Sequence, residues 1–278
     1  MGEFWTGANV SKDETPPVAL TIAGTDSGGN AGLAADLKTF AAHRVHGVFA
    51  VTVVTAQNTT GIVSAVPMER SLIEAQIDAT LDDFIIGATK TGLLFSPQAV
   101  ASVAERADRL GPLVVDPVLV TSQGKPMLSP EMASRYIEQL FPHAVVITPN
   151  VAEAALLTGV TVDDRVSAAR AAEALLSFGP KAVVVTGLLE PSHAVDVVAT
   201  ESGTKTMEHE RVDTINVLGT GCSLAAAVTA RLCREESVEQ AIAGAAEFVL
   251  EGLRSGSRWR LGEGRGPIDH FVSPDREA

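Results

Sequence analysis

The chain has 278 residues, of which 21 are Lys or Arg and 34 are Asp or Glu, so its formal net charge is −13. This length can bury a large core and is typical of one large α/β domain. Because the charge is acidic and no run of Lys or Arg is present, we expect neither a nucleic-acid partner nor binding to an anionic membrane. A nucleotide ligand is still compatible with this charge, because backbone N–H groups and one local lysine suffice for phosphate.

The first 16 residues are polar and end in Pro16, and we expect them to form a disordered leader before a single domain over residues 17–278. They contain no basic segment followed by an apolar one, and no later segment is apolar over about 18 residues. We therefore expect a cytoplasmic protein. Cys222 and Cys233 lie about 16 Å apart if one helix carries both, which excludes a disulfide and suits a reducing compartment.

From Pro17 onward, apolar runs rich in β-branched residues alternate with segments of helical period, which is typical of βα units around a mostly parallel sheet. The predicted strands are residues 18–24, 48–58, 88–94, 113–118, 144–150, 181–187 and 194–200. The predicted helices between them are residues 31–43, 69–84, 96–110, 129–140 and 165–179. In the last third of the chain, residues 205–212 predict an extra edge strand, and residues 222–234 and 238–253 predict two helices.

Polar residues concentrate at the carboxyl ends of the predicted strands. They are Asp26, Gln57, Asn58, Lys90, Asp116, Thr148, Asn150, Thr186 and Gly187. Ligands bind at this edge of an open parallel sheet, so we expect a ligand site there. Ordinary strand-to-helix turns would explain each residue separately, but they explain the series less well. Asp116 is the clearest member, because it directly follows the apolar run Leu113–Val115.

Two glycine-rich turns precede predicted helices. The first, GTDSGGNAG at residues 24–32, matches neither a P-loop nor a GxGxxG motif, and a tight turn explains it equally well. The second, VLGTGCS at residues 217–223, leads at once into a helix whose first N–H groups suit an oxyanion or phosphate. The field of that helix favours the thiolate of Cys222, which predicts a proton acceptor. The alternative is a small packing residue at a helix start.

Asn150 and Glu153 lie one helical turn apart at the end of a predicted strand. This spacing suits Mg²⁺ held through water beside phosphates. It suits a helix N-cap with its capping-box partner better. Lys90 is either a buried, paired lysine or a phosphate contact. His43 and His46 have no further ligand placed to complete a metal site, so we expect both at the surface.

The ordered set of motifs resembles the hydroxymethylpyrimidine and phosphomethylpyrimidine kinases of thiamine biosynthesis, within the ribokinase-like superfamily. The resemblance extends from about Val18 to Phe271. The motifs that carry it are ALTIAGTDSGGNAGLAADLKTF, TAQNTTG, AQIDATLDD, KTGLL, VVDPV, VITPNVAEAALL, DVV, GTGCSLAAAV and GPIDHF. It implies a three-layer α/β fold with helices on both faces of a mostly parallel sheet. It also implies a homodimer that uses ATP and Mg²⁺ to phosphorylate hydroxymethylpyrimidine and then its monophosphate.

The resemblance assigns roles to individual residues. Cys222 falls on the cysteine expected to act as catalytic base, and its amide, with those of Gly219, Thr220 and Gly221, would form the anion hole. Asp116 and Glu153 would lie at Mg²⁺. The residues implied for the nucleotide are Thr148, Asn150, Thr186 and Gly187. Those implied for the pyrimidine are Gly24, Asp26, Ala34, Asn58, Leu93 and Val120.

The chain departs from the family's pattern mainly at the substrate end. Ala34 stands where the family has a glutamine that contacts the pyrimidine, which should weaken or shift specificity. Asn30 replaces a glycine, and Leu93 replaces a methionine. Thr186 replaces a lysine near the phosphates, and Leu218 replaces a histidine. Since threonine at position 186 also occurs in pyridoxine kinases, a pyridoxal-type vitamin kinase is an alternative. A catalytically weak paralogue that binds a pyrimidine or nucleotide is another.

Overall fold

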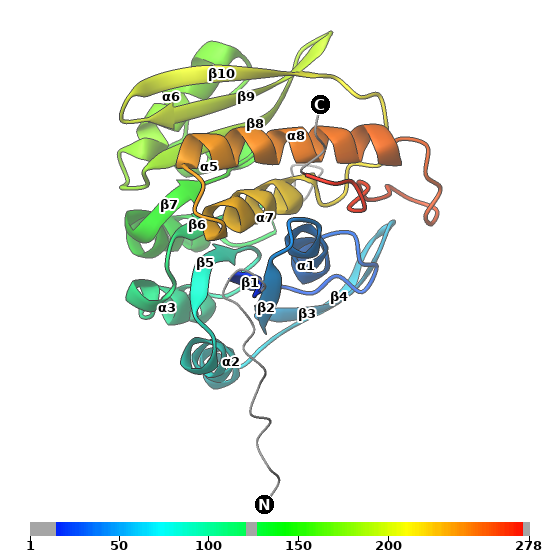
Figure 1. The fold of residues 1–278 in the computed structure, drawn as a ribbon. Coiled ribbons are helices and arrows are strands. Elements are labelled where there is room, and N and C mark those ends of the chain that lie inside the picture. The colour runs from blue at the N-terminus through cyan, green and yellow to red at the C-terminus, as the bar shows by residue number, and fades with distance from the viewer. Residues whose placement is uncertain (1–14, 121–126, 275–278) are drawn as a thin grey trace, which may run out of the picture.

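An eight-stranded sheet forms the centre of the computed structural model, which describes residues 15–120 and 127–274 (Figure 1). The strands are β1 (Val18–Ala23), β2 (His46–Val51), β3 (Val53–Asn58), β4 (Gly61–Pro67), β5 (Ile86–Thr91), β6 (Leu113–Val115), β7 (Ala144–Ile147), β8 (Ala182–Leu189), β9 (His193–Thr200) and β10 (Gly203–Glu210). The sheet order is β10-β9-β8-β7-β6-β5-β1-β2. All pairings from β8 to β2 are parallel, and β9 and β10 are antiparallel. The predicted mostly parallel sheet is confirmed, and the predicted edge strand is β10.

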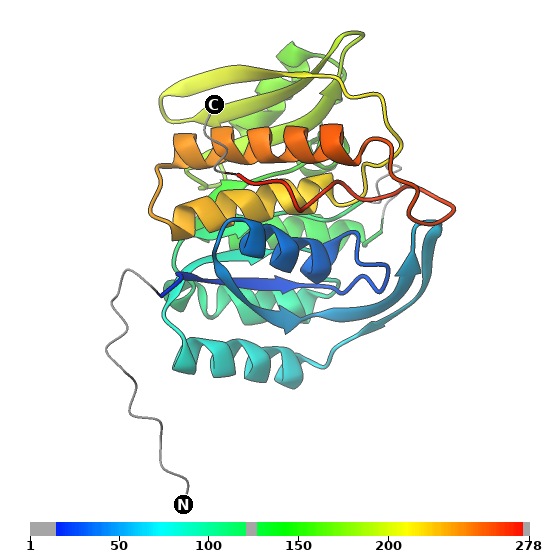
Figure 2. The same ribbon diagram turned by 45° about the vertical axis from the view of Figure 1, so that its right-hand side comes forward.

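Helices cover both faces of the sheet (Figures 1 and 2). They are α1 (Gly32–Ala42), α2 (Arg70–Asp83), α3 (Pro97–Ala104), α4 (Pro130–Arg135), α5 (Val151–Thr158), α6 (Arg165–Leu176), α7 (Thr220–Cys233) and α8 (Val238–Gly256). Side chains of α1, α7 and α8 share one core with Val114 of β6, and α2 to α6 share the other core with Leu113 and Val115. Alternate residues of a strand thus face opposite cores. The predicted three-layer α/β fold is confirmed.

The apolar run 48–58 is not one strand, as predicted, but two. The chain breaks at Thr52, whose N–H donates to Ala23 O at 3.0 Å and whose hydroxyl donates to Leu93 O at 2.6 Å. Beyond Thr52, β3 leaves the large sheet and pairs antiparallel with β4, a strand that was not predicted. The result is a hairpin at the ligand edge of the sheet. Its tip lies beside the C-terminal loop (Figure 2).

His43 is buried, so the prediction of a surface residue is wrong. Its Nδ1 lies 2.8 Å from Thr39 O one turn earlier in α1, and its ring packs edge-on against Phe248 of α8. The side chain is covered by α8, which lies far from α1 in the sequence. The residues next to His43 therefore give no indication that it is buried. His46 is exposed, as expected.

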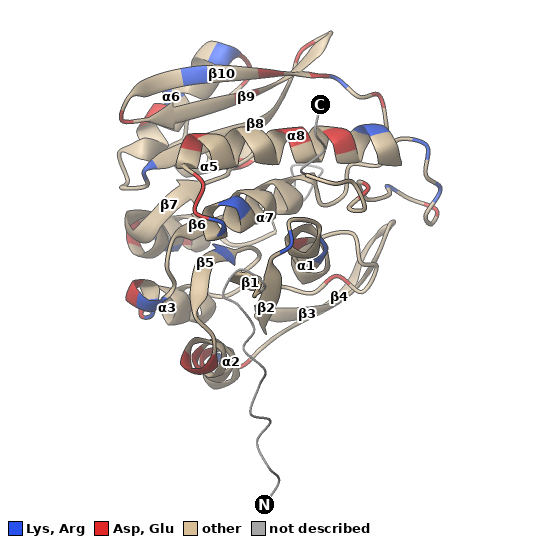
Figure 3. Cartoon of the chain, in the orientation of Figure 1, with Lys and Arg blue, Asp and Glu red and all other residues tan. Residues whose placement is uncertain are grey.

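Figure 3 shows Lys and Arg positions interspersed with Asp and Glu positions among the helices, strands and loops. Among the described helices, none combines the length and the apolar character needed to cross a bilayer. The expectation of no nucleic-acid partner stays a prediction. The predicted leader falls outside the described residues except for Thr15 and Pro16.

Candidate active site

The turn VLGTGCS starts α7 at the ligand edge of the sheet. Gly219 is the N-cap residue with φ 79°, a left-handed conformation that favours glycine. A Cβ on Gly219 would lie 2.1 Å from the backbone oxygen of Asn30, so this turn packs backbone to backbone against the first glycine-rich turn. A Cβ on Gly221 would meet no atom of the described residues within 4 Å. The start of α7 therefore has room for a ligand beside Gly221.

The first amides of α7 fit the predicted anion hole. A helix leaves its first N–H groups without intrahelical partners, and they carry the positive end of the helix dipole. Gly221 and Cys222 occupy the second and third positions of α7. The N–H of Thr220 also donates to Val217 O at 3.4 Å, so this amide is weakly engaged within the turn. The helix start predicted from the sequence near Cys222 is confirmed.

Cys222 lies above a buried charged cluster and keeps some contact with solvent. Burial and the charge of Asp116 together raise the pKa of its thiol to about 12, although Lys90 and the N–H of Gly32 oppose the shift. The thiol in turn lowers the pKa of Asp116. The expected thiolate is therefore not the favoured form, because desolvation outweighs the helix field.

Lys90 is the centre of the buried cluster. Its Nζ lies 3.1 Å from Asp36 Oδ2 and 3.8 Å from Asp116 Oδ2, and the side chains of Lys90 and Asp36 are fully buried. Burial alone would lower the pKa of Lys90, but Asp36, Cys222 and Asp116 together raise it, so the ammonium stays charged. Of the two alternatives, a buried and paired lysine or a phosphate contact, the structure supports the first.

Sequence reasoning missed Asp36, although a signal was present. Asp36 lies on the same buried face of α1 as Leu33 and Phe40. A charged side chain on the apolar face of a helix is rare unless it is paired. Asp36 accepts from Lys90 and, at 2.6 Å, from the hydroxyl of Thr21.

The carboxylates of Asp116 and Glu153 are both buried. Glu153 accepts the N–H of Asn150 at 3.0 Å and that of Leu119 at 3.1 Å, and Asn150 Oδ1 accepts the N–H of Glu153, so the predicted capping box is confirmed. Burial raises the pKa of Asp116, and burial together with the charge of Asp116 raises that of Glu153. Two buried carboxylates that repel each other favour a cation between them.

Three neighbouring strands end in buried polar atoms that have no hydrogen-bond partner among residues 15–120 and 127–274. These atoms are Thr91 Oγ1 on β5, Asp116 Oδ2 after β6 and Thr148 Oγ1 after β7. Buried polar groups in folded proteins nearly always have a partner. A row of unpartnered atoms along one sheet edge therefore indicates a site for a polar ligand.

The residues implied for the nucleotide lie together along β7 and β8. Asn150 and Thr186 form a parallel bridge, and the N–H of Thr186 donates to Pro149 O at 2.9 Å. Gly187 has φ 82° with open space at its Cβ position, at a bulge in β8. The predicted strand 181–187 continues to Leu189, because β8 turns back into β9 after this bulge.

Asp26 shapes the first glycine-rich turn. Its carboxylate accepts the N–H groups of Gly28 at 2.8 Å and of Asn30 and Ala31 at 2.9 Å each. The carboxylate is thus engaged in fixing the turn that Gly219 contacts. Its predicted role in binding the pyrimidine stays a prediction.

The other residues implied for the pyrimidine come from several segments. Gly24 is buried, and a Cβ there would lie 2.6 Å from Val53 Cγ1, so a side chain at this position would push the start of β3 away. Ala34 is half-buried in the first turn of α1, and Leu93 lies beside Gly24. Val120 is buried, and its N–H lowers the pKa of Glu153.

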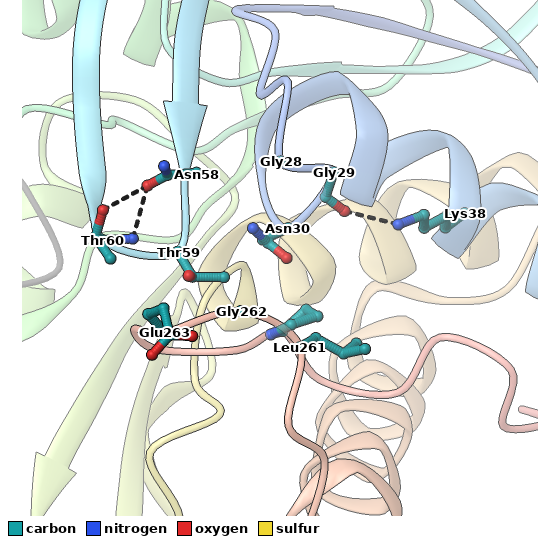
Figure 4. Close-up of a pocket in the computed structure, with 11 residues that line it drawn as sticks. Gly28, Gly29, Asn30, Lys38, Asn58, Thr59, Thr60, Leu261, Gly262 and Glu263 are labelled. Carbon is teal, nitrogen blue, oxygen red and sulfur yellow. Dashed lines mark hydrogen bonds between the residues drawn. The ribbon is translucent and has the colours of Figure 1, made fainter.

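A pocket of about 560 Å³ lies between the first glycine-rich turn, the hairpin tip and the C-terminal loop (Figure 4). Asn58 is the one residue predicted for the pyrimidine that lines it, and Asn58 Oδ1 accepts the N–H and the hydroxyl of Thr60. The pocket reaches the VLGTGCS turn through Asn30, which contacts Gly219, and Pro267, which pairs with Leu218. The full lining is Gly28, Gly29, Asn30, Lys38, Asn58, Thr59, Thr60, Leu261, Gly262, Glu263 and Pro267.

The side chain of His270, in the motif GPIDHF, should make the free energy of unfolding depend on pH. It is buried, and its Nε2 lies 2.8 Å from Ser223 Oγ on α7. Burial lowers its pKa from 6.5 to about 4, so between these values the unfolded chain binds a proton that the folded chain does not. The contribution of the neutral histidine to the free energy of unfolding is fully present above pH 6.5, and about 3 kcal/mol of it is lost as the pH falls to 4.

Urea unfolding at pH 7, 5.5 and 4 tests this expectation. The free energy of unfolding should depend less on pH in His270→Gln than in the unchanged protein. Parallel curves would show that His270 is not the source.

The fold and this site define a ribokinase-like α/β protein in which a glycine-rich helix start adjoins a buried charged cluster. A sequence model of the family described as Phosphomethylpyrimidine kinase matches residues 26–269. The chain therefore belongs to the phosphomethylpyrimidine kinase family.

Individual relatives agree with this assignment. The chain is 42% identical over 257 residues to a Streptomyces coelicolor protein named Hydroxymethylpyrimidine/phosphomethylpyrimidine kinase, with 92% of this chain and 95% of the relative covered. It is similar to the ADP complex of Bacillus subtilis pyridoxal kinase, with a TM-score of 0.86, 35% identity and coverage of 92% and 98%. It is also similar to phosphomethylpyrimidine kinase from Clostridium difficile, with a TM-score of 0.76, 33% identity and coverage of 85% and 99%.

Proposed function

We propose that the protein transfers the γ-phosphoryl group of ATP to the hydroxyl of hydroxymethylpyrimidine and then to the phosphate of the monophosphate. The observation that supports this proposal most strongly is the geometry at the start of α7. There Gly219 packs against Asn30, and Cys222 lies above Lys90 and Asp116. Family membership and the name of the Streptomyces coelicolor relative support this substrate. The ADP complex of the Bacillus subtilis neighbour supports ATP as donor.

The backbone at the start of α7 stabilises the transferring group. Phosphoryl transfer needs an in-line acceptor and neutralisation of charge on the equatorial oxygens, with little covalent chemistry from the protein. The amides of Gly219, Thr220, Gly221 and Cys222 supply fixed dipoles that need not reorganise during the reaction. The same positive helix end suits the charged monophosphate in the second transfer.

Cys222 accepts the proton of the attacking hydroxyl late in the transfer. Its own thiol proton must first pass to solvent, with which Cys222 keeps some contact. Burial and the Asp116 charge oppose this loss, and Lys90 and the Gly32 N–H favour it. A positioned general base contributes about two to four orders of magnitude in rate.

Asp116 and Glu153 are suited to hold Mg²⁺. The residues beside the nucleotide would be Thr148, Asn150, Thr186 and Gly187. Asp116 Oδ2 is a buried carboxylate oxygen without a hydrogen-bond partner in the part of the chain that the structure describes. Within the described part of the chain, no three His, Cys, Asp or Glu side chains converge on one point. Mg²⁺ needs no such cage, because it keeps several waters and takes one or two carboxylates together with phosphate oxygens. When bound, Mg²⁺ would neutralise phosphate charge and the Asp116 charge that raises the thiol pKa.

A coupled ADP-release assay with hydroxymethylpyrimidine, its monophosphate and pyridoxal tests the proposal. We expect turnover with the two pyrimidines and a lower kcat/KM with pyridoxal. Thr186 and the similarity to a pyridoxal kinase make pyridoxal the second candidate, and a higher kcat/KM with pyridoxal would reassign the acceptor. Measurable binding without turnover of any acceptor would identify a catalytically weak paralogue. We also infer a homodimer from the family resemblance, which light scattering would test.

Gly219→Ala should lower kcat at least tenfold. Its Cβ would strike Asn30 O, and φ 79° is unfavourable for alanine, so the start of α7 must shift away from the acceptor. Gly159→Ala is a matched control, because Gly159 has φ 72° and no atom within 4 Å of a Cβ. It should cost about 1 kcal/mol in urea unfolding and leave kcat unchanged. Equal losses of kcat in both variants would contradict the role of the close approach.

A further inference from the structure

The C-terminal strap, defined here as residues 261–267, joins the hairpin tip to the segment before α7. Three consecutive N–H groups make the connection. Those of Gly264 and Arg265 donate to Thr59 Oγ1 at 3.0 Å and to Thr59 O at 3.2 Å. That of Gly266 donates to Asn216 Oδ1 at 3.1 Å. One short stretch of backbone thus binds two elements that are more than 150 residues apart in the sequence.

The glycines of the strap allow very close approach. A Cβ on Gly264 would lie 2.1 Å from Thr59 O, and one on Gly266 would lie 2.4 Å from Asn216 Oδ1. Real Cβ atoms do not tolerate such distances, so both contacts require glycine. The sequence GEGRG at residues 262–266 therefore fits a backbone clamp on Thr59 and Asn216.

Asn216 connects the strap to the start of α7. It is 2% exposed, and its Nδ2 donates to Gly256 O at 2.8 Å and to Trp259 O at 3.0 Å. Two residues further along the chain, the N–H of Leu218 donates to Gly266 O at 3.0 Å. Leu218 directly precedes Gly219. The position of the anion-hole turn is therefore fixed partly through Asn216.

The hairpin is held at a second place, on the first glycine-rich turn. The hydroxyl of Ser27 donates to Gln57 O at 2.7 Å, and the N–H of Gln57 donates to Ser27 Oγ at 2.8 Å. The hairpin tip, the first glycine-rich turn and the strap enclose the pocket drawn in Figure 4. Each of these three walls is hydrogen-bonded to a neighbouring wall or to the VLGTGCS segment.

We propose that Thr59 and Asn216 are positioning residues for the transfer reaction. Through the strap they hold the hairpin, which carries Asn58, at a fixed distance from the start of α7, so that the acceptor hydroxyl meets the phosphoryl group in line. This inference rests on the proposed function. Rate depends steeply on such alignment, because a misplacement of about 1 Å can cost about 100-fold.

The test uses the full-length protein in the ADP-release assay with hydroxymethylpyrimidine. Thr59→Val removes the hydroxyl that accepts from Gly264 at a partly exposed site, so the variant should fold. We expect kcat/KM for the acceptor to fall about tenfold while KM for ATP is unchanged, and Thr59→Ser should restore it. Asn216→Ala should lower kcat/KM for the acceptor about 100-fold.

Ser255→Ala is the matched control. It removes a 2.7 Å bond to Asp269 in the same C-terminal region but outside the strap, and it should leave both KM values and kcat unchanged. Unaltered acceptor kinetics in Thr59→Val would overturn the inference while leaving the proposed function intact. Equal losses for acceptor and ATP in Thr59→Val would also overturn it. Failure of the unchanged protein to turn over any acceptor would instead refute the proposed function.

Discussion

Cys222→Ala is expected to lower kcat by about 10²- to 10⁴-fold while leaving the Kd for ATP nearly unchanged. The substitution removes the group placed to accept the hydroxyl proton, but it keeps the backbone amides of α7. The thiol takes no part in the ion pairs of Lys90 with Asp36 and Asp116, so its removal leaves the charged cluster in place. Single-turnover phosphoryl transfer and nucleotide titration measure the two quantities separately.

Cys233→Ala provides the internal control for this prediction. Cys233 ends the same helix, and its Sγ donates to Val18 O at 3.2 Å, far along α7 from Cys222. Its replacement should leave kcat unchanged. If Cys222→Ala keeps most of its turnover, the anion hole alone accounts for the chemistry and Cys222 is a packing residue.

Lys90→Met is expected to lower the free energy of unfolding by about 3–5 kcal/mol at pH 7. The methionine has a similar volume, but Asp36 would keep only the hydroxyl of Thr21 as a partner in a fully buried place. Burial already raises the pKa of Asp36, so removal of Lys90 should raise it further. The difference from the unchanged protein should therefore shrink as the pH falls and the carboxyl group takes up a proton.

Two controls separate the buried charge from a general packing defect. The double variant Lys90→Met, Asp36→Asn should recover most of the lost stability in urea unfolding, because no unpaired charge remains. Arg70→Met removes an exposed ion pair with Glu74 and Glu105, and it should have a much smaller effect. A double variant no more stable than Lys90→Met would show that the loss comes from packing.

The sequence predicted the parts of the site that depend on local order along the chain. Asp116 after an apolar run, Asn150 and Glu153 as a capping box, and the helix start at Cys222 all follow from residues within one or two turns of each other. The sheet edge where they meet follows from the parallel βα pattern. These features could be predicted because strand ends and helix starts have signals in neighbouring residues.

Features that depend on contacts between distant segments could not be predicted in the same way. The pKa of Cys222 is set by burial and by Asp116, about 100 positions away, which reverses the local effect of the helix. The break at Thr52 depends on bonds to Ala23 and Leu93, and the burial of His43 depends on α8. The C-terminal strap has no local signal beyond its glycines.

The most direct test of the central claim is to follow the pyrimidine product by phosphorus NMR with ATP and Mg²⁺. Transfer at the start of α7 predicts that a phosphomonoester of hydroxymethylpyrimidine forms first and a diphosphate follows, with one ADP released for each phosphoryl group transferred. Release of ADP with inorganic phosphate as the sole product, at a rate unaffected by the pyrimidine, would contradict the account.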